Sequence, residues 1–270
     1  MQSFDYHRPG TLAELDAVFA AQPEARALAG GMTLLPSMKL RLAAPPALVD
    51  LSGIAELRGI RSEADAITIG AMTRHAEIER SAEVRSLLPA LAELAGGIGD
   101  PQVRHRGTLG GSIANHDPAA DYPAALLALG ATVWTTRRTI AAADFFTGMF
   151  ETALQPGELV TAVRFPRAAL AAYEKVRSPA SRYALVGVFV AKTAGGVRVA
   201  VTGAASCVFR AEAIEAALAE RFAPESLDGL RHPADDLNSD LHADAAYRAH
   251  LITVLARRSV QKALAAGGRG

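Results

Sequence analysis

Residues 98–131 read IGDPQVRHRGTLGGSIANHDPAADYPAALLALGA, and the centre of this stretch, GTLGGSIANH at 107–116, decides how the chain folds. Eight of the ten central residues are small or polar, although helix-like apolar segments lie on both sides. A run with so little side-chain bulk is typical of a flexible linker, a tight turn, or backbone that approaches a ligand closely. The surrounding sequence helps to discriminate among these three interpretations.

The composition is that of a soluble protein with a large core. The chain has 270 residues, half of them hydrophobic, which is enough for two or three domains. Its 28 Lys and Arg balance its 28 Asp and Glu, so nothing favours nucleic-acid binding, which needs a basic surface. Cys207 is the only cysteine, which excludes an internal disulfide and any iron–sulfur cluster ligated by this chain alone.

The N-terminus and the hydropathy pattern predict a soluble cytoplasmic protein. MQSFDYHRPG at 1–10 lacks the basic start and apolar run of a signal peptide. No apolar stretch of about 18 residues occurs, so we expect no membrane span. The histidines lack metal-ligand spacing and no acid–base pair stands out, so we expect neither a metal site nor a catalytic residue.

The first 55 residues predict a βαβ-like unit with a glycine turn at a strand end. A short strand at 27–28 ends at Gly30-Gly31. A helix at 34–42 then precedes a strand at 47–51.

The rest of the chain mixes helices and strands, and the last 100 residues form a unit of a hairpin plus helices. Gly195-Gly196 is the expected turn of that hairpin. The predicted strands are 65–72, 131–135, 159–165, 183–192 and 197–203. One predicted helix begins near 73, and four others span 87–95, 122–129, 211–220 and 243–265.

Two glycine segments suggest an anion site. They are AGGMT at 29–33 and TLGGS at 108–112, and Thr33, Thr108 and Ser112 add hydroxyl groups. Glycine allows positive φ and removes the Cβ atom, so successive N–H groups can converge on an anion, and a helix start adds unpaired N–H groups. Two such segments could cradle the two phosphates of a dinucleotide; the alternative is two ordinary turns.

Other nucleotide-binding motifs are absent, and some polar residues stay ambiguous. Neither GxGxxG nor GxxxxGK[ST] occurs, so neither a nicotinamide Rossmann site nor a P-loop is expected. Asp121 precedes the helix at 122–129, either as its N-cap or as a ligand of ribose or ribityl hydroxyls. Arg104 and Arg106 either neutralise a diphosphate or cap a surface loop.

Together these segments resemble the FAD-binding medium subunits of molybdenum hydroxylases, the family of aerobic carbon monoxide dehydrogenases and bacterial xanthine dehydrogenase-like enzymes. The resemblance covers nearly the whole chain. AGGMTLLPSMKLRL at 29–42 and the stretch at 98–131 are similar to the family's two flavin loops. FFTGMFETALQPGELVTAVRFP at 145–166 is similar to its strand beside the flavin ring, and YEKVRSPASRYALVGVFVAK at 173–192 to the start of its C-terminal domain.

The resemblance implies an α+β fold with three parts. A small N-terminal α/β subdomain at 1–58 and a larger α+β subdomain at 59–168 would hold FAD extended between them, as in FAD-binding domains of the PCMH type. A C-terminal three-stranded sheet with helices at 169–270 would be the docking surface for partner subunits, including LNSDLH at 237–242.

The resemblance also implies cofactor-binding residues. The first loop would hold the pyrophosphate, and GTLGGSIANH at 107–116 would have little side-chain bulk so that its backbone can touch the same diphosphate. Asn115 and Asp121 would meet the ribityl and ribose region, and Tyr183 would cover one face of the isoalloxazine. The full set is Ala29, Gly30, Gly31, Met32, Thr33, Thr108, Gly110, Gly111, Ser112, Asn115, Asp121, Leu159, Val160, Lys175 and Tyr183, the last four beside the ring.

Two residues depart from the family pattern. Position 32 is often His or Gln in this family, whereas Met32 cannot donate a hydrogen bond to the flavin. Arg182 precedes Tyr183 where the family commonly has Asp, which changes the charge expected near the ring. Either departure would alter the redox potential or the choice of electron acceptor.

The implied function is that of a flavoprotein oxidoreductase subunit. The chain would take electrons from [2Fe-2S] clusters in a small partner, fed by a molybdenum cofactor in a large partner, and pass them through FAD to NAD, a quinone or oxygen. The assembly would be a heterotrimer or a dimer of heterotrimers, and the large partner would select the substrate. Two alternatives stay open: a self-contained flavin-dependent oxidase or reductase, and a non-catalytic assembly subunit that has lost FAD.

Overall fold

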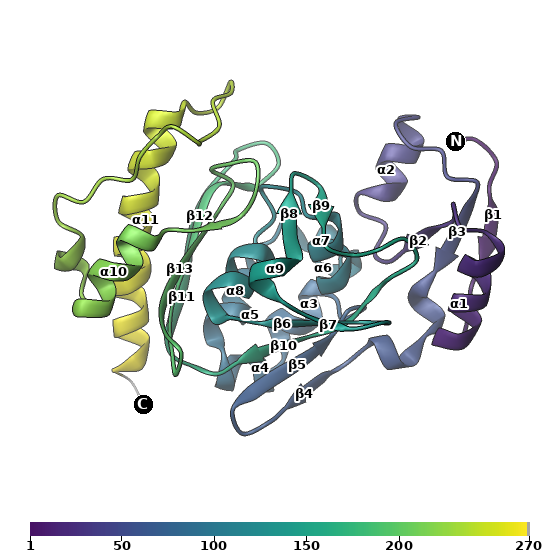
Figure 1. Ribbon diagram of the computed structural model, residues 1–270, viewed down its shortest axis with the longest axis horizontal. Helices are drawn as coiled ribbons and strands as arrows, with labels where there is room; N and C mark the ends of the chain where they lie inside the picture. Colours follow the sequence, from purple (N-terminus) through teal and green to yellow (C-terminus); the bar gives the residue numbers. More distant parts are fainter. Residues whose placement is uncertain (269–270) are drawn as a thin grey trace.

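The structure, a computed structural model, describes residues 1–268. The chain forms a row of three units, with an N-terminal unit at one end and a helix-backed C-terminal sheet at the other (Figure 1). Helices and strands are mixed, and the strands fall into several separate sheets. The predicted α+β class is therefore confirmed.

The N-terminal unit is a three-stranded parallel sheet with its connecting helices. The strand order is β1-β3-β2, which confirms the βαβ prediction and adds β1, a strand that the sequence analysis missed. The elements are β1 (Asp5–His7), α1 (Leu12–Ala21), β2 (Arg26–Leu28), α2 (Leu34–Lys39) and β3 (Ala47–Asp50), followed by the 3-10 turns η1 (Leu51–Gly53) and η2 (Ala55–Leu57).

The central unit is a five-stranded antiparallel sheet covered by helices. Its order is β4-β5-β10-β6-β7, so the late strand β10 lies in the middle of the sheet. The strands are β4 (Ile60–Ser62), β5 (Ala66–Gly70), β6 (Thr132–Thr135), β7 (Thr139–Ala141) and β10 (Val160–Pro166), with a separate hairpin of β8 (Phe146–Gly148) and β9 (Glu151–Thr152). The helices are α3 (His75–Arg80), α4 (Ala82–Leu87), α5 (Pro89–Gly96), α6 (Pro101–Arg106), α7 (Leu109–Asn115), α8 (Tyr122–Leu129) and α9 (Ala142–Phe145).

The C-terminal unit is an antiparallel sheet with helices on its outer face. Three long strands match the expectation, and the two-residue strand β14 extends the sheet to four. The strand β11 was not predicted, because its alanine-rich start has low β propensity, and pairing with β12 forms it nonetheless. The elements are β11 (Ala168–Arg177), β12 (Ala184–Thr193), β13 (Gly196–Thr202), β14 (Phe209–Arg210), α10 (Glu212–Glu220), η3 (Pro224–Leu227) and α11 (Ala245–Gly267).

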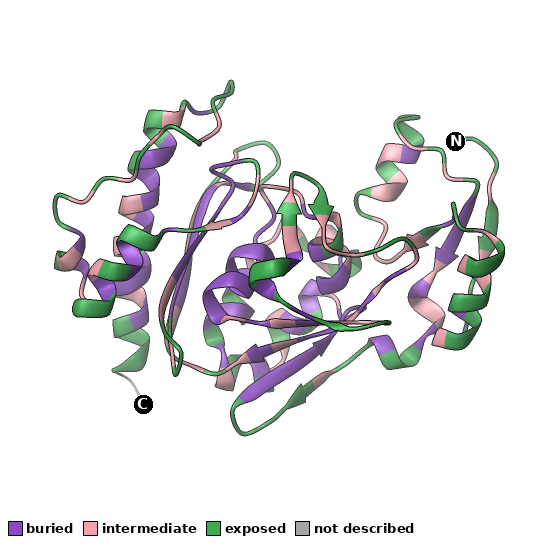
Figure 2. Cartoon of the chain, in the orientation of Figure 1, coloured by how far each residue is buried: buried purple, intermediate pink, exposed green. Residues whose placement is uncertain are grey.

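The C-terminal sheet buries both of its faces. Phe189 and Ala200 face inward and join the core of the central unit. Val188 and Val201, one position along each strand, face outward and pack under α10 and α11. Because side chains alternate across a strand, one hairpin serves two cores, and its strands are coloured as buried over much of their length in Figure 2. The division into 1–58, 59–168 and 169–270 stays a prediction.

Helix α8 lies between the central unit and the C-terminal sheet and is buried along its whole length. Its sequence, YPAALLAL, has no polar side chain apart from the Tyr122 hydroxyl, as expected of a helix surrounded by protein. Asp121, at its start, is therefore held at the junction of the two units.

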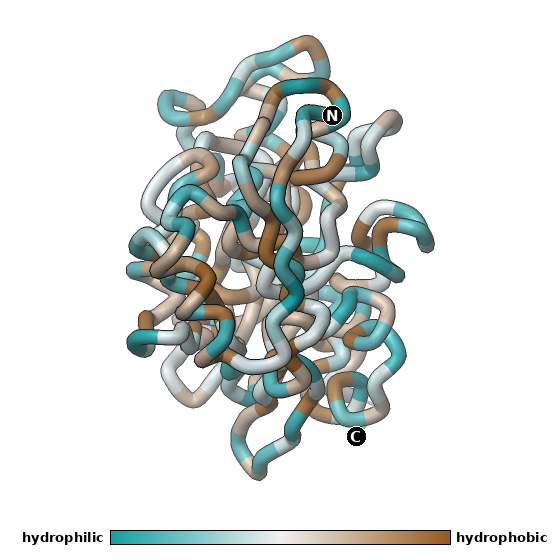
Figure 3. Tube along the Cα trace, turned by 90° about the vertical axis from the view of Figure 1, so that its right-hand side faces the viewer, coloured by the Kyte–Doolittle hydropathy of each residue, from teal (hydrophilic) through white to brown (hydrophobic). Residues whose placement is uncertain are grey.

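No helix within residues 1–268 combines the length and the apolarity that crossing a membrane requires. Figure 3 shows hydrophilic and hydrophobic segments interspersed along the chain.

Candidate functional site

One large cleft gathers nearly all of the residues predicted to bind a cofactor. It has a volume of about 1390 Å³ and lies where the N-terminal unit meets the central unit. Its wall includes the loop before α2, helix α7, the start of β10, the β8–β9 hairpin and the turn before β12. Every predicted cofactor residue except Lys175 lines it.

The first glycine loop carries free backbone donors. The N–H groups of Gly30, Gly31, Met32 and Thr33 have no hydrogen-bond acceptor within the described chain, and all four residues line the cleft. Gly31 has φ +72°, a conformation that L side chains rarely adopt. Unpaired amides in a row on a cleft wall form a site suited to an anion such as a diphosphate.

The second glycine segment is neither a turn nor an open helix end. Gly110 and Gly111 lie within helix α7, which Thr108 caps by accepting from the Gly111 N–H at 3.1 Å. The amide of Leu109 donates to the Thr73 carbonyl at 3.0 Å, and that of Gly110 to the Ala71 carbonyl at 2.8 Å. The expectation that this helix start offers unpaired N–H groups is therefore wrong, because protein acceptors already occupy them.

Close packing explains why the two segments need glycine. A Cβ atom on Gly30 would overlap the carbonyl oxygen of Arg106 and lie 2.8 Å from the Cα atom of Gly107. A Cβ atom on Gly110 would lie 2.9 Å from the Cα atom of Ala71. The small residues thus let the first loop lie directly against the second, and this contact forms one wall of the cleft.

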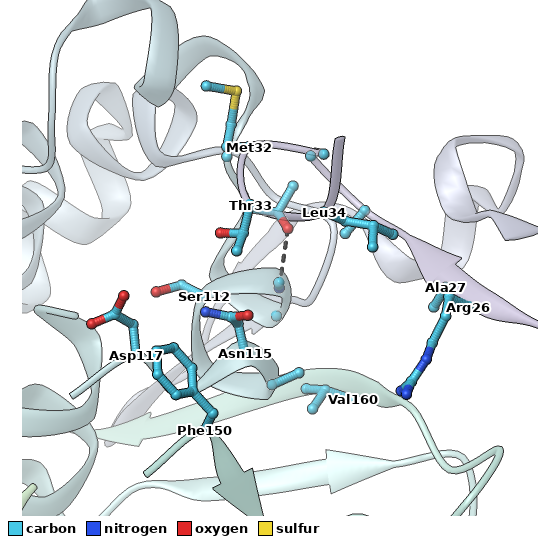
Figure 4. A pocket seen from close by; sticks show the side chains of 18 of the residues that line it. Arg26, Ala27, Met32, Thr33, Leu34, Ser112, Asn115, Asp117, Phe150 and Val160 are labelled. Atoms are coloured by element: carbon cyan, nitrogen blue, oxygen red, sulfur yellow. Dashed lines mark hydrogen bonds between the residues drawn. The ribbon is translucent and has the colours of Figure 1, made fainter. Parts of the chain in front are cut away.

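Several polar side chains on the cleft wall have no hydrogen-bond partner within residues 1–268. They include the Thr33 and Ser112 hydroxyls and the Asn115 amide, and Figure 4 shows Ser112 and Asn115 side by side on α7. Ser112 and Asn115 are only partly exposed. Partly buried polar groups without a protein partner are suited to bind a polar ligand.

Residues at the two ends of the cleft differ in character. Val160 lies near Ala27 and Arg26, whereas Asp117 and Phe150 lie on the other side of Asn115 (Figure 4). Leu159 packs on the N-terminal core. Tyr183 belongs with the Asp117 end, because the amide of the next residue, Ala184, donates to the Ala119 carbonyl at 3.4 Å. Val160 and Tyr183 therefore lie towards opposite ends, which disfavours the expectation that both flank one ring.

Asp121 is a buried, paired carboxylate and does not cap its helix. Its side chain makes no capping hydrogen bond. It accepts from the Tyr173 hydroxyl at 2.5 Å and from the Lys175 ammonium at 2.9 Å, and only 4% of the side chain is exposed. Burial raises the pKa of Asp121, and the charge and hydrogen bond of Lys175 oppose that rise.

Lys175 supports the cleft from behind. Its ammonium group also donates to the Arg182 carbonyl at 3.2 Å, and its side chain is 4% exposed. Arg182 has φ +62° and immediately precedes Tyr183, a residue that lines the cleft and is 43% exposed. The lysine thus ties the start of α8 to the turn that carries the tyrosine.

All non-glycine residues with positive φ within residues 1–268 lie on or beside this cleft. They are Arg41, His116, Phe150 and Arg182, and the amide of Phe150 donates to the His116 carbonyl at 3.1 Å. Such conformations are costly for side chains with a Cβ atom and gather at functional sites. No sequence signal marked Phe150.

His116 and His75 are buried histidines in this region. His116 is buried, with its ring centroid 4.5 Å from that of Phe146 and its Nδ1 atom 2.9 Å from the Glu151 carbonyl oxygen. His75 lines the cleft, and its Nδ1 atom lies 3.2 Å from the Tyr122 hydroxyl. Burial, with a contribution from the Arg104 charge, lowers the pKa of His75 to about 4, so the ring is neutral at pH 7.

The two arginines of the second segment have different roles. The Arg104 Nε–H donates to Glu79 at 3.0 Å, and its Nη1 donates to the Ile98 carbonyl at 3.1 Å, so this guanidinium is committed within the protein. Arg106 is exposed and does not line the large cleft. Neither is placed to neutralise an anion there. Within residues 1–268, no three His, Cys, Asp or Glu side chains lie together in a way that could hold a metal ion.

Comparison with known proteins identifies consistent relatives. Residues 2–168 match the family model described as the FAD binding domain in molybdopterin dehydrogenase. The chain is 38% identical to the carbon monoxide dehydrogenase medium chain of Afipia carboxidovorans, over 97% of both chains. It is 32% identical to the glyceraldehyde dehydrogenase medium chain of Sulfolobus acidocaldarius, over 96% of this chain and 98% of the relative.

Solved structures show the same fold. A Cu,Mo-CO dehydrogenase in its cyanide-inactivated form contains a chain that superposes with a TM-score of 0.89 at 37% identity, covering 98% of both chains. A chain of quinoline 2-oxidoreductase from Pseudomonas putida 86 superposes with a TM-score of 0.87 at 30% identity, again over 98% of both.

Proposed function

This chain belongs to the family of FAD-binding domains of molybdopterin dehydrogenases and is the FAD-binding medium subunit of an oxidoreductase, and from that premise we propose where FAD lies and what the chain does with it. FAD is held in the large cleft, with its diphosphate on the first glycine loop. The observation that carries this proposal is the row of free amides from Gly30 to Thr33 on the cleft wall. No acceptor atom in residues 1–268 binds these N–H groups, so all four are available to the diphosphate.

The other residues of the cleft would orient the cofactor. The Ser112 hydroxyl and the Asn115 amide, both without a protein partner, would bind its sugar or ribityl oxygens. Tyr183 would cover one face of the isoalloxazine at the Asp117 end. Val160, at the other end near the apolar Ala27, and the preceding residue Leu159 then suit the adenine better than the flavin ring. Met32 and Gly111 complete the wall between the ends.

The chain's own contribution is to bind, orient and shield. Bound FAD supplies a ring that accepts and releases electrons, and the protein around it sets the potential and the access. The neutral His75 and the paired Asp121 place no free charge beside the cofactor. Lys175 contributes indirectly, because it fixes the turn that presents Tyr183.

We propose that the complex has the composition suggested by the relatives' names as medium chains. A large subunit would carry the molybdenum cofactor, and a small subunit would carry the [2Fe-2S] clusters that deliver electrons to this chain. NAD, a quinone or oxygen would then take the electrons. The C-terminal unit, including residues 237–242, would contribute to docking.

The first experiment is the visible spectrum of the purified chain, with the released cofactor identified by chromatography. One FAD per chain supports the cleft assignment. A Gly111→Arg variant should lose FAD, because a Cβ atom there already lies 2.9 Å from the Thr108 hydroxyl and 3.3 Å from the Ala29 Cβ atom. Gly195→Arg, in a hairpin turn where a Cβ atom would meet nothing closer than 3.6 Å, is the matched control. Full FAD in Gly111→Arg would refute the placement.

A further inference from the structure

A second cleft of about 440 Å³ adjoins the first and has a different chemical character. Four arginines line it, contributed by the end of β1, the loop after η2, the start of α3 and the end of α6. We call it the arginine cleft; these residues are Arg8, Arg58, Arg74 and Arg106. Ala29, Gly30, Met72 and Thr108 line both clefts, so the two share a wall.

The arginine cleft is strongly positive. Asp50 is the one carboxylate among its lining residues, which leaves a net charge of +3. That carboxylate already accepts from the Tyr6 hydroxyl at 2.5 Å and from the Ser52 amide at 2.8 Å, with Arg8 at 3.8 Å. It therefore cannot neutralise the remaining guanidinium groups.

Most donors in the arginine cleft are unused. The side chains of Arg74 and Arg106 have no acceptor anywhere in residues 1–268. Arg8 donates from Nε to the Ser52 hydroxyl at 3.1 Å, and Arg58 donates from Nη2 to the Ser52 carbonyl at 2.9 Å. Each of these two still has free N–H groups.

The backbone holds the two unpaired arginines near one another. Arg74 and Thr108 form an antiparallel bridge, and the His75 amide donates to the Gly107 carbonyl at 3.0 Å. Arg106 directly precedes this bridged segment, and its carbonyl is packed against Gly30. The guanidinium groups are therefore anchored on fixed backbone, although the side chains themselves reach solvent.

We propose that the arginine cleft is a second anion site that binds a small molecule bearing two or more adjacent phosphates. Guanidinium groups form paired hydrogen bonds with phosphate oxygens, and a charge of +3 matches a diphosphate. The volume suits a compound no larger than a nucleotide. The site goes beyond the proposed function, because none of its four arginines lines the cleft assigned to FAD, although Gly30 lines both.

The test is calorimetric titration of the FAD-saturated full chain with inorganic pyrophosphate, and then with ADP. We expect one site per chain that weakens as NaCl is raised. Arg74→Gln combined with Arg106→Gln should weaken binding by about tenfold or more, because two charged donors are lost. Arg61→Gln combined with Arg231→Gln removes the same charge from exposed positions outside both clefts and should bind like the parent.

The results of this titration distinguish a nucleotide ligand, recognition of the phosphates alone, and the absence of a second site. Tighter binding of ADP than of pyrophosphate identifies a nucleotide, and equal binding identifies the phosphates alone as the recognised group. No saturable binding, or equal weakening in both double variants, overturns the site. Binding only to FAD-free protein, with displacement by FAD, also overturns it, because the arginine cleft would then be part of the cofactor site. If the chain binds no FAD at all, the proposed function fails while the same titration still tests the arginine cleft.

Discussion

The ammonium group of Lys175 lies 2.8 Å from a carboxylate oxygen of Asp121, and both side chains are almost fully buried. The same ammonium group donates to the Arg182 carbonyl. One buried ion pair thus connects the end of the second flavin-loop segment to the turn that carries Tyr183. A contact 54 residues apart in sequence fixes the geometry of the cleft.

Lys175→Met should destabilise the fold by about 3–5 kcal/mol, because it leaves the Asp121 carboxylate buried without its partner. Burial already raises the pKa of Asp121, so the folded state binds its proton more tightly than the unfolded state. Such a group stabilises the fold at low pH and loses that effect as pH rises. Urea denaturation should therefore show a larger loss at pH 8 than at pH 5.

The double variant Asp121→Asn with Lys175→Met is the control for this prediction. It removes both charges, so it should recover part of the lost stability and show little pH dependence from this pair. Equal losses in the single and double variants would mean that packing, and not the charge, accounts for the effect.

Gly30→Ala should separate the two glycine segments. Its Cβ atom would overlap the Arg106 carbonyl, which belongs to rigid backbone. We expect a loss of about 1–3 kcal/mol in the free energy of unfolding, together with weaker FAD binding. Gly195→Ala, whose Cβ atom would meet nothing closer than 3.6 Å, should behave like the parent. Thermal denaturation and FAD titration would check both, and a neutral Gly30→Ala would contradict the close packing.

Asn115→Ala should weaken FAD binding without affecting the fold. The side-chain amide has no hydrogen-bond partner in the described chain, so its removal breaks no hydrogen bond within the protein. Bound FAD would lose one or two hydrogen bonds. The dissociation constant should rise about 3- to 10-fold. Ser86→Ala, at an exposed position away from the cleft, is the control. An unchanged dissociation constant would remove Asn115 from the site.

Acid should destabilise the protein partly through His75. Its folded pKa of about 4 lies below the ordinary value of 6.5, so the unfolded state binds the proton more readily between these values. Stability therefore falls as pH drops from 6.5 to 4, by up to about 3 kcal/mol from this group. His75→Gln should show a shallower decline over that range in urea denaturation at matched FAD saturation. Parallel declines would show that His75 is not responsible.

Tyr183 should control the environment of the flavin. Tyr183→Leu removes an aromatic face from the cleft wall, whereas Tyr183→Phe keeps it. FAD bound to the leucine variant should fluoresce more strongly and react faster with oxygen, and the phenylalanine variant should resemble the parent. If both variants differ from the parent in the same way, the hydroxyl and not the ring is the relevant group.

Most of the residues predicted to bind the cofactor line the cleft, because they lie in two short segments, the first loop and residues 108–115, that glycine and hydroxyl patterns mark. Their binding of FAD stays a prediction, and many other lining residues, such as those of the β8–β9 hairpin, carry no such pattern. The physical roles of the predicted residues were harder to assign. Gly110 could have touched a ligand, and only the fold reveals that Ala71 occupies that space.

Other features depend on contacts that the local sequence does not encode. Lys175 is buried behind the cleft because its partners Asp121 and Arg182 come from two other segments. Phe150 adopts positive φ only because its amide binds the His116 carbonyl. The strand β11 begins with alanines and forms by pairing along β12. Tertiary contacts override local propensity in each case.

The hydrogen bonds between residues 118–120 and the C-terminal hairpin have a consequence for biosynthesis. The Thr202 hydroxyl donates to the carbonyls of Pro118 and Ala120, and the Gly203 amide donates to Pro118. These acceptors leave the ribosome more than 80 residues before their donors. When both glycine segments have left the ribosome, the residues of the C-terminal hairpin that bind residues 118–120 have therefore not yet been synthesised. We therefore expect FAD to bind stably only after β13 has been synthesised, because β13 holds Ala120 of the cleft wall in place.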